Sequence, residues 1–324
     1  MYYIIVNPAS KSGKGSKIWS IVEPVLIKKG IEYSVFFSRE AGHVIRYVRE
    51  LSASLLNNTS DFTLKLIVLG GDGTLNETLQ GISDFGRVHL GYIPTGSSND
   101  LARDLQLPKD PLKILEGILS CEKPFMMDLG CLTYDQLSDE LSRQHSDLNS
   151  STRYFAVSCG IGFDAAVCEE ALASKFKNVL NKIGLGKLTY LTIALKQLIK
   201  AKKITCTITL DDGKPIDLPK FLFVACMSHQ YEGGGFKFCP GADAADGIID
   251  VCAVGNIPKW LILIALPTAF FGKHYIFKGI DHYTACKIHL ETSAPLWVHT
   301  DGEVTRKSNS ITITCKQQKL QFLL

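Results

Sequence analysis

Short apolar runs alternate with amphipathic stretches over roughly the first 105 residues of the chain. Strand-like runs occupy residues 2–6, 31–37, 64–69 and 88–93, and helical periodicity falls between them at 16–29, 42–56 and 74–82. Pro24 is expected to bend the first of these helices. Regular alternation of this kind predicts a doubly wound α/β domain, in which helices cover both faces of a parallel sheet.

The pattern changes after about residue 128, where strand signals dominate. They occupy residues 154–159, 204–210, 221–227, 248–254, 284–290 and 311–315, with helical patterns at 165–201 and 258–272. Asp211, Asp212 and Gly213 predict a turn between two of the strands, and the polar segment 134–153 predicts a surface loop. We therefore expect a second domain, a β-sandwich, over 129–304 after a first domain of 1–128, and leave open that about 305–324 packs back on the first.

Composition excludes several classes of protein. With 324 residues and 46% hydrophobic content, the chain is long and apolar enough for two folded domains, and general disorder is excluded. A net charge of +3 gives no reason to expect nucleic-acid binding. The ten cysteines are scattered without a C-x-x-C pair, which favours reduced, buried thiols over disulfides or structural zinc.

The apolar segments indicate a cytoplasmic protein. The chain starts directly with a strand pattern, and no signal peptide is evident. The longest apolar stretch, at 260–272, contains Pro267 and is shorter than the roughly 20 residues that span a bilayer. We interpret this stretch as a buried helix in preference to an element that dips into a membrane.

The segment 64–77, LKLIVLGGDGTLNE, is the most informative part of the sequence. An apolar strand stops at Gly70 and Gly71, and a helical pattern begins within a few residues. Glycines allow a ligand to approach the backbone closely, and a helix N-terminus attracts anions through unpaired N–H groups and its dipole. The turn therefore suits a phosphate group, although glycines at a strand-to-helix turn can also serve geometry alone.

Seven residues of this turn match the signature GGDGTxNE and resemble the diacylglycerol kinase catalytic domain family, which includes bacterial lipid kinases. They are Gly70, Gly71, Asp72, Gly73, Thr74, Asn76 and Glu77. A P-loop is excluded because no Gly-Lys-Ser/Thr follows, and the dinucleotide fingerprint G-x-G-x-x-G is absent from this turn. The resemblance implies a Rossmann-like first domain of the NAD kinase and phosphofructokinase type.

Two further blocks extend the resemblance within the first domain. Residues 7–15, NPASKSGKG, are similar to the family's NPxSGxxxG, but Lys11 and Ser12 separate Ser10 from Gly13. Residues 94–103, PTGSSNDLAR, are similar to PxGTxNDxAR, with Ser97 in place of threonine. The resemblance implies that the nucleotide is contacted by Asn7, Ser38, Gly70, Gly71, Asp72, Gly73, Thr74, Leu75, Asn76 and Ser97.

Acidic residues point to bound cations. Asp72, Asp100 and Asp128 each follow a strand or turn signal, and converging carboxylates repel one another unless a cation bridges them. The resemblance assigns these three to a Mg²⁺·ATP network. It also implies a structural Mg²⁺ held by Asp243, Asp246 and the backbone carbonyl of Ile248, although a solvated acidic turn remains the alternative there.

The segment 299–303, HTDGE, supplies the candidate base. A lipid hydroxyl must lose its proton as it attacks phosphorus, and a carboxylate can accept that proton. The resemblance gives this role to Glu303, the last residue of the family's DGE motif. The sequence alone favours a simpler interpretation, in which Asp301 and Gly302 form a hairpin turn.

Lysines are concentrated between Lys175 and Lys203, without an acidic residue among them. Such a helical face is usually only solvated, but lysines near an anionic bilayer each contribute about 1 kcal/mol of binding. We therefore keep membrane docking through this face as a hypothesis. The eight lysines are Lys175, Lys177, Lys182, Lys187, Lys196, Lys200, Lys202 and Lys203.

These observations together predict an ATP-dependent lipid kinase that uses Mg²⁺ and phosphorylates a hydroxyl, such as that of diacylglycerol, at the periphery of the membrane. The alternatives are an NAD kinase-like enzyme acting on a small molecule and a non-catalytic lipid-binding or regulatory module. Intact Asp72 and Glu303 argue against the module. The sequence identifies neither the acceptor lipid nor whether the protein is a monomer or a homodimer.

Overall fold

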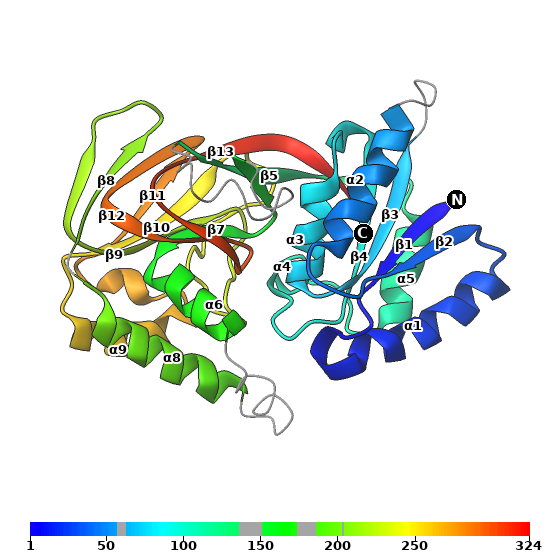
Figure 1. Cartoon of the computed structure of the whole chain (residues 1–324), viewed down its shortest axis with the longest axis horizontal. Helices are drawn as coiled ribbons and strands as arrows, with labels where there is room; N and C mark the ends of the chain where they lie inside the picture. The colour runs from blue at the N-terminus through cyan, green and yellow to red at the C-terminus, as the bar shows by residue number, and fades with distance from the viewer. Residues whose placement is uncertain (57–62, 136–150, 174–185, 203) are drawn as a thin grey trace. The chain divides into compact units, whose positions relative to one another are not determined.

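The computed structural model divides the chain into two compact units. Unit 1 consists of Met1–Leu129, Ala244–Asp246 and Lys316–Leu324, and unit 2 consists of Gly130–Asp243 and Gly247–Cys315. The structure describes residues 1–56, 63–135, 151–173, 186–202 and 204–324 (Figure 1).

Unit 1 is built on a parallel sheet. Its strands are β1 (Tyr2–Val6), β2 (Tyr33–Phe37), β3 (Leu64–Gly70) and β4 (Val88–Pro94). Along the sheet the order is β4-β3-β1-β2, and Gln321–Leu323 adds a further parallel strand beside β4. The central strand β3 is almost entirely buried, as expected when helices cover both faces.

The helices of unit 1 lie on both faces of this sheet (Figure 1). Helices α1 (Ser10–Lys28) and α5 (Pro111–Ser120) share one apolar core, to which Trp19, Leu26 and Ile118 contribute. Helix α2 (His43–Leu56) packs against α3 (Asp72–Gly81). The short elements η1 (Phe85–Arg87) and α4 (Asp100–Asp104) flank β4. The prediction of a doubly wound domain is confirmed.

Unit 2 is formed mainly by antiparallel strands. The short strands β7 (Ser158–Gly162) and β8 (Ile204–Leu210) each pair with both of the long strands β9 (Ile216–Met227) and β12 (Lys287–Thr300). These strands surround an apolar core that contains Phe155, Ile208 and Ile288. The predicted β-sandwich is confirmed. The other strands are β5 (Phe125–Tyr134), β6 (Thr152–Phe155), β10 (Ile249–Gly255), β11 (Ile280–Ala285) and β13 (Glu303–Leu323). The start of β5 and the end of β13 belong to unit 1, where Gln321–Leu323 of β13 pairs with β4.

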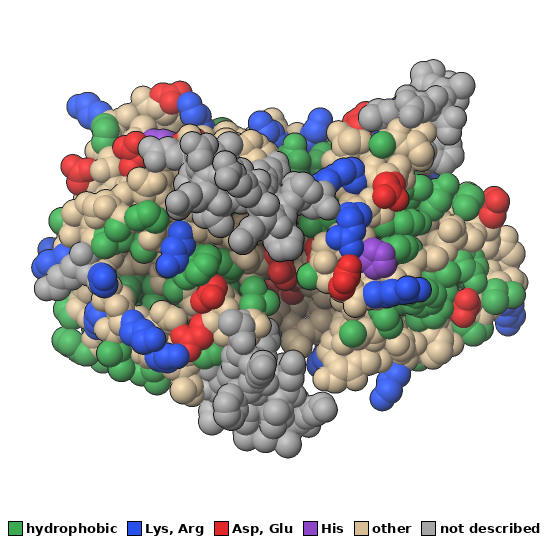
Figure 2. Space-filling model, in the orientation of Figure 1, with side chains coloured by type: hydrophobic (Ala, Val, Ile, Leu, Met, Phe, Trp, Pro, Cys, Tyr) green, Lys and Arg blue, Asp and Glu red, His purple; other side chains and the backbone are tan. Residues whose placement is uncertain are grey.

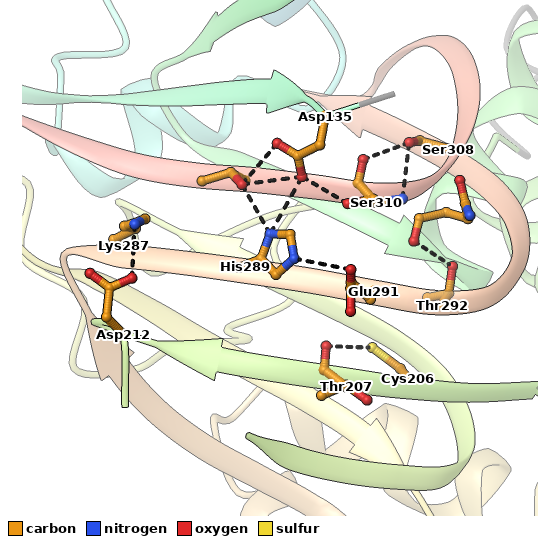
Figure 3. Close-up of polar contacts among 12 residues, drawn as sticks. Asp135, Cys206, Thr207, Asp212, Lys287, His289, Glu291, Thr292, Ser308 and Ser310 are labelled. Carbon is orange, nitrogen blue, oxygen red and sulfur yellow. Dashed lines mark hydrogen bonds and ion pairs between the residues drawn. The ribbon is translucent and has the colours of Figure 1, made fainter. Parts of the chain in front are cut away.

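Polar side chains tie the end of β5 to β12 and β13 (Figure 3). The carboxylate of Asp135 accepts hydrogen bonds from the hydroxyls of Ser310, at 2.9 Å, and Thr312, at 3.0 Å. Thr312 also lies 3.1 Å from Nδ1 of His289, whose Nε2 is 3.5 Å from Glu291. The network fixes the chain at Asp135, the last described residue before 151.

The helices of unit 2 are α6 (Phe163–Ala173), α8 (Gly186–Lys200) and α9 (Lys259–Ala269), followed by η2 (His274–Ile276). The predicted helix at 165–201 contains α6 and α8, and 174–185 lie outside the described residues. Helix α9 is the predicted apolar helix, but only one of its faces is buried, through Ile262, Ala265 and Ala269. None of the described helices is long and apolar enough to cross a bilayer.

Several predicted elements have different ends in the structure. The single strand expected at 284–290 is two strands, because the amides of Cys286 and Lys287 both donate to the carboxylate of Asp211 and turn the chain between β11 and β12. The turn at Asp211 and Asp212 is confirmed, with positive φ at both. Helix α1 continues past Pro24 to Lys28, and its irregular part lies instead at Lys11–Gly13.

Candidate active site

The ends of β3 and β4 bring two glycine turns of unit 1 into backbone contact. A Cβ atom built on Gly96 would lie 2.7 Å from Cα of Gly71, and one on Gly71 would lie 3.1 Å from Cα of Gly96. The amide of Thr95 donates to the carbonyl of Gly70 at 2.7 Å. The turns at 70–74 and 94–100, which the sequence connects only by motif, are therefore adjacent at the carboxyl edge of the sheet, where ligands of doubly wound folds bind.

The loop after β1 joins the same edge through side chains. Asn7 donates from Nδ2 to Oγ1 of Thr74 at 3.0 Å, and Ser10 shares a 2.6 Å hydrogen bond with the hydroxyl of Thr95. A Cβ atom on Gly15 would overlap the carbonyl oxygen of Asn7, so this close approach requires glycine. The sequence pointed to Asn7 and Thr74, but Ser10 and Thr95 emerge only from the structure.

Helix α3 presents an anion-binding N-terminus. Its N-cap, Gly71, has no side chain to cap the first turn, and helix N-termini attract phosphate groups through their amides and their dipole. Gly73 and Thr74 belong to this first turn. Leu75 and Asn76 are 2% and 0% exposed, and Oδ1 of Asn76 accepts a hydrogen bond from Gln80, so both residues pack inside unit 1.

Asp72 lies at the first position of α3 and connects it to the turn before α4. Its Oδ2 accepts a hydrogen bond from the amide of Asn99 at 2.8 Å, and Asn99 adopts a left-handed conformation with φ of 51°. The next residue, Asp100, is buried and forms a 3.1 Å ion pair with Arg103. Ser97, by contrast, is exposed on the same turn.

Two other predicted residues occupy neighbouring positions. Ser38 follows β2 directly, and its amide donates to the carbonyl of Val6 at the end of β1. Glu77, the last residue of the GGDGTxNE block, accepts from the amide of Gly42 at 2.8 Å and from that of Val44 at 3.3 Å. Glu77 thus holds the start of α2. This structural role accounts for its place in the motif, since no nucleotide contact is assigned to it.

Asp128 is completely buried in β5. Its Oδ1 accepts from the amide of Gln318 at 2.6 Å, and its own amide donates to the carbonyl of Ala244. The C-terminal segment and the acidic loop at 241–250 therefore both contact this aspartate. The same loop carries Asp243 and Asp246, whose exposed carboxylates lie three positions apart, beside Gly247 with its positive φ. This oxygen-rich turn fits a hard cation such as Mg²⁺.

The DGE turn joins β12 to β13 in unit 2. Asp301 has φ of 50° and Gly302 has φ of 81°, so the hairpin turn expected from the sequence is present. Asp301 Oδ1 accepts hydrogen bonds from the amides of Val157, at 2.8 Å, and Ser158, at 3.1 Å, and Oδ2 accepts from Ala156 at 3.0 Å. The carboxylate of Asp301 thus holds the turn in place, and Glu303 follows as the residue paired with Thr300.

A buried cluster lies next to this turn. Nε2 of His299 is 3.2 Å from Oδ2 of Asp164 and 3.1 Å from Oε1 of Glu232, and the side chain of His299 is fully buried. The amide of Gly302 donates to Nδ1 of His299 at 3.2 Å. When the ring is neutral, Nδ1 accepts this hydrogen bond and the ring hydrogen lies on Nε2, facing the two carboxylates. Burial lowers the pKa of His299, but the carboxylates of Glu232 and Asp164 outweigh burial and raise the pKa well above its usual value.

This tautomer decides what the cluster can do. A histidine that binds a metal through Nε2 normally donates a hydrogen bond from its other nitrogen, whereas Nδ1 of His299 faces a backbone donor. Asp164, Glu232 and His299 therefore suit a hydrogen-bonded network better than a metal site. Cys239, Asp250 and His282 also lie close together, but burial raises the pKa of the Cys239 thiol well above its usual range, which favours the neutral thiol.

Comparison with known proteins agrees with this geometry. Residues 1–130 match the model of the diacylglycerol kinase catalytic domain, and residues 157–323 match the YegS C-terminal NAD kinase beta sandwich-like domain. A diacylglycerol kinase of Staphylococcus carnosus is 37% identical over 302 residues, which cover 93% of this chain and 87% of the relative. The chain belongs to the diacylglycerol kinase family.

Other members of the diacylglycerol kinase family extend the similarity over most of the chain. A diacylglycerol kinase of Mycobacterium tuberculosis is 25% identical over 299 residues, which cover 92% of this chain and 87% of the relative. A solved structure of a diacylglycerol kinase from Bacillus anthracis superposes with a TM-score of 0.67 at 20% identity, covering 99% of this chain and 96% of that one. The solved structure shows the shared fold, and the relatives indicate an enzyme of the lipid kinase type.

The cluster beside the DGE turn is expected to make the stability of this family member depend on pH. Burial raises the pKa of Asp164 above its usual value of 3.8, against the opposing effect of its hydrogen bond with His299. The folded state then holds more protons than the unfolded state, so the free energy of unfolding falls as the pH rises from about 4 toward the raised pKa. We expect Asp164→Asn, which cannot ionise, to reduce this fall in urea unfolding measured across that pH range.

Asp217→Asn is the matched control, because Asp217 is exposed on β9 and accepts a hydrogen bond from Thr207. The control is expected to keep the pH dependence of the original protein. Equal pH slopes for Asp164→Asn and the original protein would contradict the assignment of a retained proton to the cluster.

Proposed function

We propose that the protein transfers the γ-phosphate of ATP to the hydroxyl of a lipid alcohol such as diacylglycerol, giving a phosphatidate-like phosphomonoester. The observation that carries the proposal is the DGE turn. Asp301 is fully engaged by three backbone amides, so the turn is rigid and Glu303 has a defined place on it. Named diacylglycerol kinases that align over most of the chain support the choice of a lipid acceptor.

Unit 1 would bind the nucleotide. The amides at the start of α3 and the linked side chains of Asn7 and Thr74 offer donors to phosphate oxygens. Asp72, Asp100 and Asp128 are proposed to hold Mg²⁺ directly or through water, and Asp243, Asp246 and the carbonyl of Ile248 a second, structural Mg²⁺. When bound, Mg²⁺ neutralises charge on the triphosphate and so favours transfer.

The transfer itself requires one protein base. The hydroxyl oxygen of the lipid attacks the γ-phosphorus, the bond between this phosphorus and the bridging oxygen of ADP breaks, and ADP leaves. Glu303 accepts the hydroxyl proton as attack proceeds. The pKa of a lipid alcohol lies far above 7, which is why a positioned carboxylate matters for the rate.

The proposed location follows from the acceptor. A lipid alcohol resides in a bilayer, so the enzyme would act from the cytoplasm at the periphery of the membrane. We propose no nucleic-acid partner, because the net charge of +3 is small for a chain of this length. An NAD kinase-like activity remains the second candidate, since the model matching 157–323 is described as NAD kinase beta sandwich-like.

Transfer of label from γ-labelled ATP tests the proposal. The acceptors are diacylglycerol, a sphingoid base, a polyprenol and NAD⁺, each offered separately, with the products separated by chromatography. Label in a lipid phosphomonoester supports the proposed function, and label in NADP⁺ supports the second candidate.

A further inference from the structure

Helix α9 turns an apolar stripe toward solvent. Trp260, Leu263 and Ile264 are 64%, 43% and 52% exposed, and Pro267 continues the same stripe as an exposed residue. These positions follow the spacing i, i+3, i+4 and i+7, which defines one face of a helix. A surface helix normally carries polar residues on this face, and α9 instead packs one apolar face on unit 2 and exposes another.

The exposed apolar surface continues beyond the end of α9. Phe271 is 76% exposed and Ile276, in η2, is 75% exposed. The chain is attached on both sides of Phe271, because the ring of Phe270 stacks on that of Phe236 with centroids 4.0 Å apart, and the hydroxyl of Tyr275 donates to the carbonyl of Phe238 at 2.6 Å. These side chains therefore project from a fixed part of unit 2.

The end of α8 joins the same surface. Lys259, at the start of α9, donates from Nζ to the carbonyls of Ile199, at 2.9 Å, and Ala201, at 2.7 Å. Ile199 is 76% exposed, and Leu195, one turn earlier on α8, is 38% exposed. Figure 2 shows hydrophobic and basic side chains side by side over this part of unit 2, at the lower left.

The charge on this surface has one sign. Neither 192–202 nor 256–279 contains an aspartate or glutamate. Both segments carry exposed lysines, and Glu170 of α6, outside these segments, forms an ion pair with Lys196 and accepts a hydrogen bond from Gln197. The exposed lysines are Lys196, Lys200, Lys202, Lys259, Lys273 and Lys278.

We infer that this apolar and basic surface, formed by the end of α8, by α9 and by η2, docks on an anionic lipid bilayer. Tryptophan and phenylalanine favour the interface between lipid headgroups and acyl chains, and lysines around them attract anionic headgroups. A second copy of the chain is a poorer occupant, because two such surfaces would bring lysines against lysines. The inference rests on the proposed function in one respect, since docking would bring the enzyme to a lipid acceptor.

The docking surface overlaps only in part with the lysine-rich segment 175–203 found in the sequence. Of that region, Lys175, Lys177, Lys182 and Lys203 lie outside the described residues. The docking surface depends instead on exposed aromatic and aliphatic side chains of α9, which the sequence alone assigned to a buried helix, and of η2, which follows that stretch.

Vesicle flotation tests the inference with the full-length protein. The vesicles contain either phosphatidylcholine alone or phosphatidylcholine with about one third phosphatidylglycerol. We expect the protein to float with the anionic vesicles and the double variant Trp260→Ser/Phe271→Ser to lose at least tenfold in apparent affinity. Ile21→Ser/Ile27→Ser is the matched control, because both isoleucines are exposed on α1, at 46% and 64%, and it should float like the original protein.

Charge and self-association are tested in parallel. Lys273→Gln/Lys278→Gln should weaken binding to anionic vesicles and make it less sensitive to added salt than that of the original protein, because four of the six lysines remain. Failure of the original protein to bind anionic vesicles, or undiminished binding by Trp260→Ser/Phe271→Ser, would overturn the inference. So would a dimer in light scattering that becomes a monomer in this variant, because the surface would then serve a second copy.

A water-dispersed, short-chain diacylglycerol separates this inference from the proposed function. Phosphorylation of this acceptor by Trp260→Ser/Phe271→Ser at the rate of the original protein, with loss of flotation, supports docking as a separate property. Flotation of the original protein without transfer to any lipid acceptor would leave the docking surface supported and the proposed function rejected. Transfer to a lipid acceptor without flotation of the original protein would support the proposed function and reject the docking surface.

Discussion

Replacement of Glu303 by glutamine is expected to lower the rate of phosphoryl transfer by about 10²–10⁴-fold, the usual contribution of a positioned general base. Glutamine has nearly the same shape but cannot accept the proton of the lipid hydroxyl. The turn itself should persist, because Asp301 and the amides of 156–158 hold it without Glu303. The measurement is kcat with saturating ATP and lipid, together with thermal unfolding to show that the variant is folded.

Glu291→Gln provides the comparison for Glu303→Gln. Glu291 lies on β12 in the same unit, and its side chain is 64% exposed. Glu291→Gln removes one carboxylate, as Glu303→Gln does, but it should leave kcat unchanged. A folded Glu303→Gln enzyme with kcat within threefold of the original would exclude Glu303 as the base.

The second large effect is expected at Asp72. Asparagine can still accept the hydrogen bond from the amide of Asn99, so Asp72→Asn should preserve the contact between the turns before α3 and α4. It removes the negative charge that is proposed to attract Mg²⁺ to the triphosphate. Loss of one preorganised electrostatic group typically costs about 10²–10³-fold in kcat, and we expect a loss of that size.

The control for this variant is Asp110→Asn in the same unit. Asp110 caps α5 by accepting from the amide of Leu112 at 2.9 Å, and asparagine caps a helix equally well. The two variants are compared by measuring activity as a function of Mg²⁺ concentration. Asp72→Asn should need more Mg²⁺ than the original protein, and an unchanged Mg²⁺ requirement with full activity would remove Asp72 from the metal network.

The fold was largely predictable because its strongest signals are periodic. The runs at 2–6, 64–69 and 88–93 became β1, β3 and β4 almost without change, since buried parallel strands are continuous apolar segments. Strand β13 was far longer than the run at 311–315, because much of it carries polar side chains and lacks a simple pattern. Helix α5 was missed although Asp110 and Pro111 give its start a recognisable cap.

Motifs identified the candidate site residues, but not the contacts that position them. The pairing of Ser10 with Thr95 joins residues 85 positions apart, and no local pattern encodes it. The cluster of Asp164, Glu232 and His299 is likewise assembled from α6, β12 and the loop between β9 and β10. The hydrogen bond from the amide of Gly302 to Nδ1 of His299 is also visible only in three dimensions.

Helix α9 is a case in which the sequence pattern predicted the element but not its surroundings. Hydrophobicity on all sides predicted a buried helix at 258–272, whereas Trp260 and Ile264 are exposed in the structure. Apolar residues around a whole helix indicate apolar surroundings, but they do not say whether protein or lipid provides them. The structure shows that α9 packs on β9 and β10 through one face, to which Ala265 belongs, and that Trp260 and Ile264 lie outside this contact.

The proposed acceptor of the γ-phosphate is a lipid hydroxyl. Its most direct test offers diacylglycerol and NAD⁺ together with γ-labelled ATP and Mg²⁺, and separates the organic from the aqueous products. We expect label in the organic phase as a phosphomonoester, with none in NADP⁺, and label that accumulates about 10²–10⁴-fold more slowly with Glu303→Gln. Label in NADP⁺, or no label in any lipid from an enzyme that is folded and binds ATP, would contradict it.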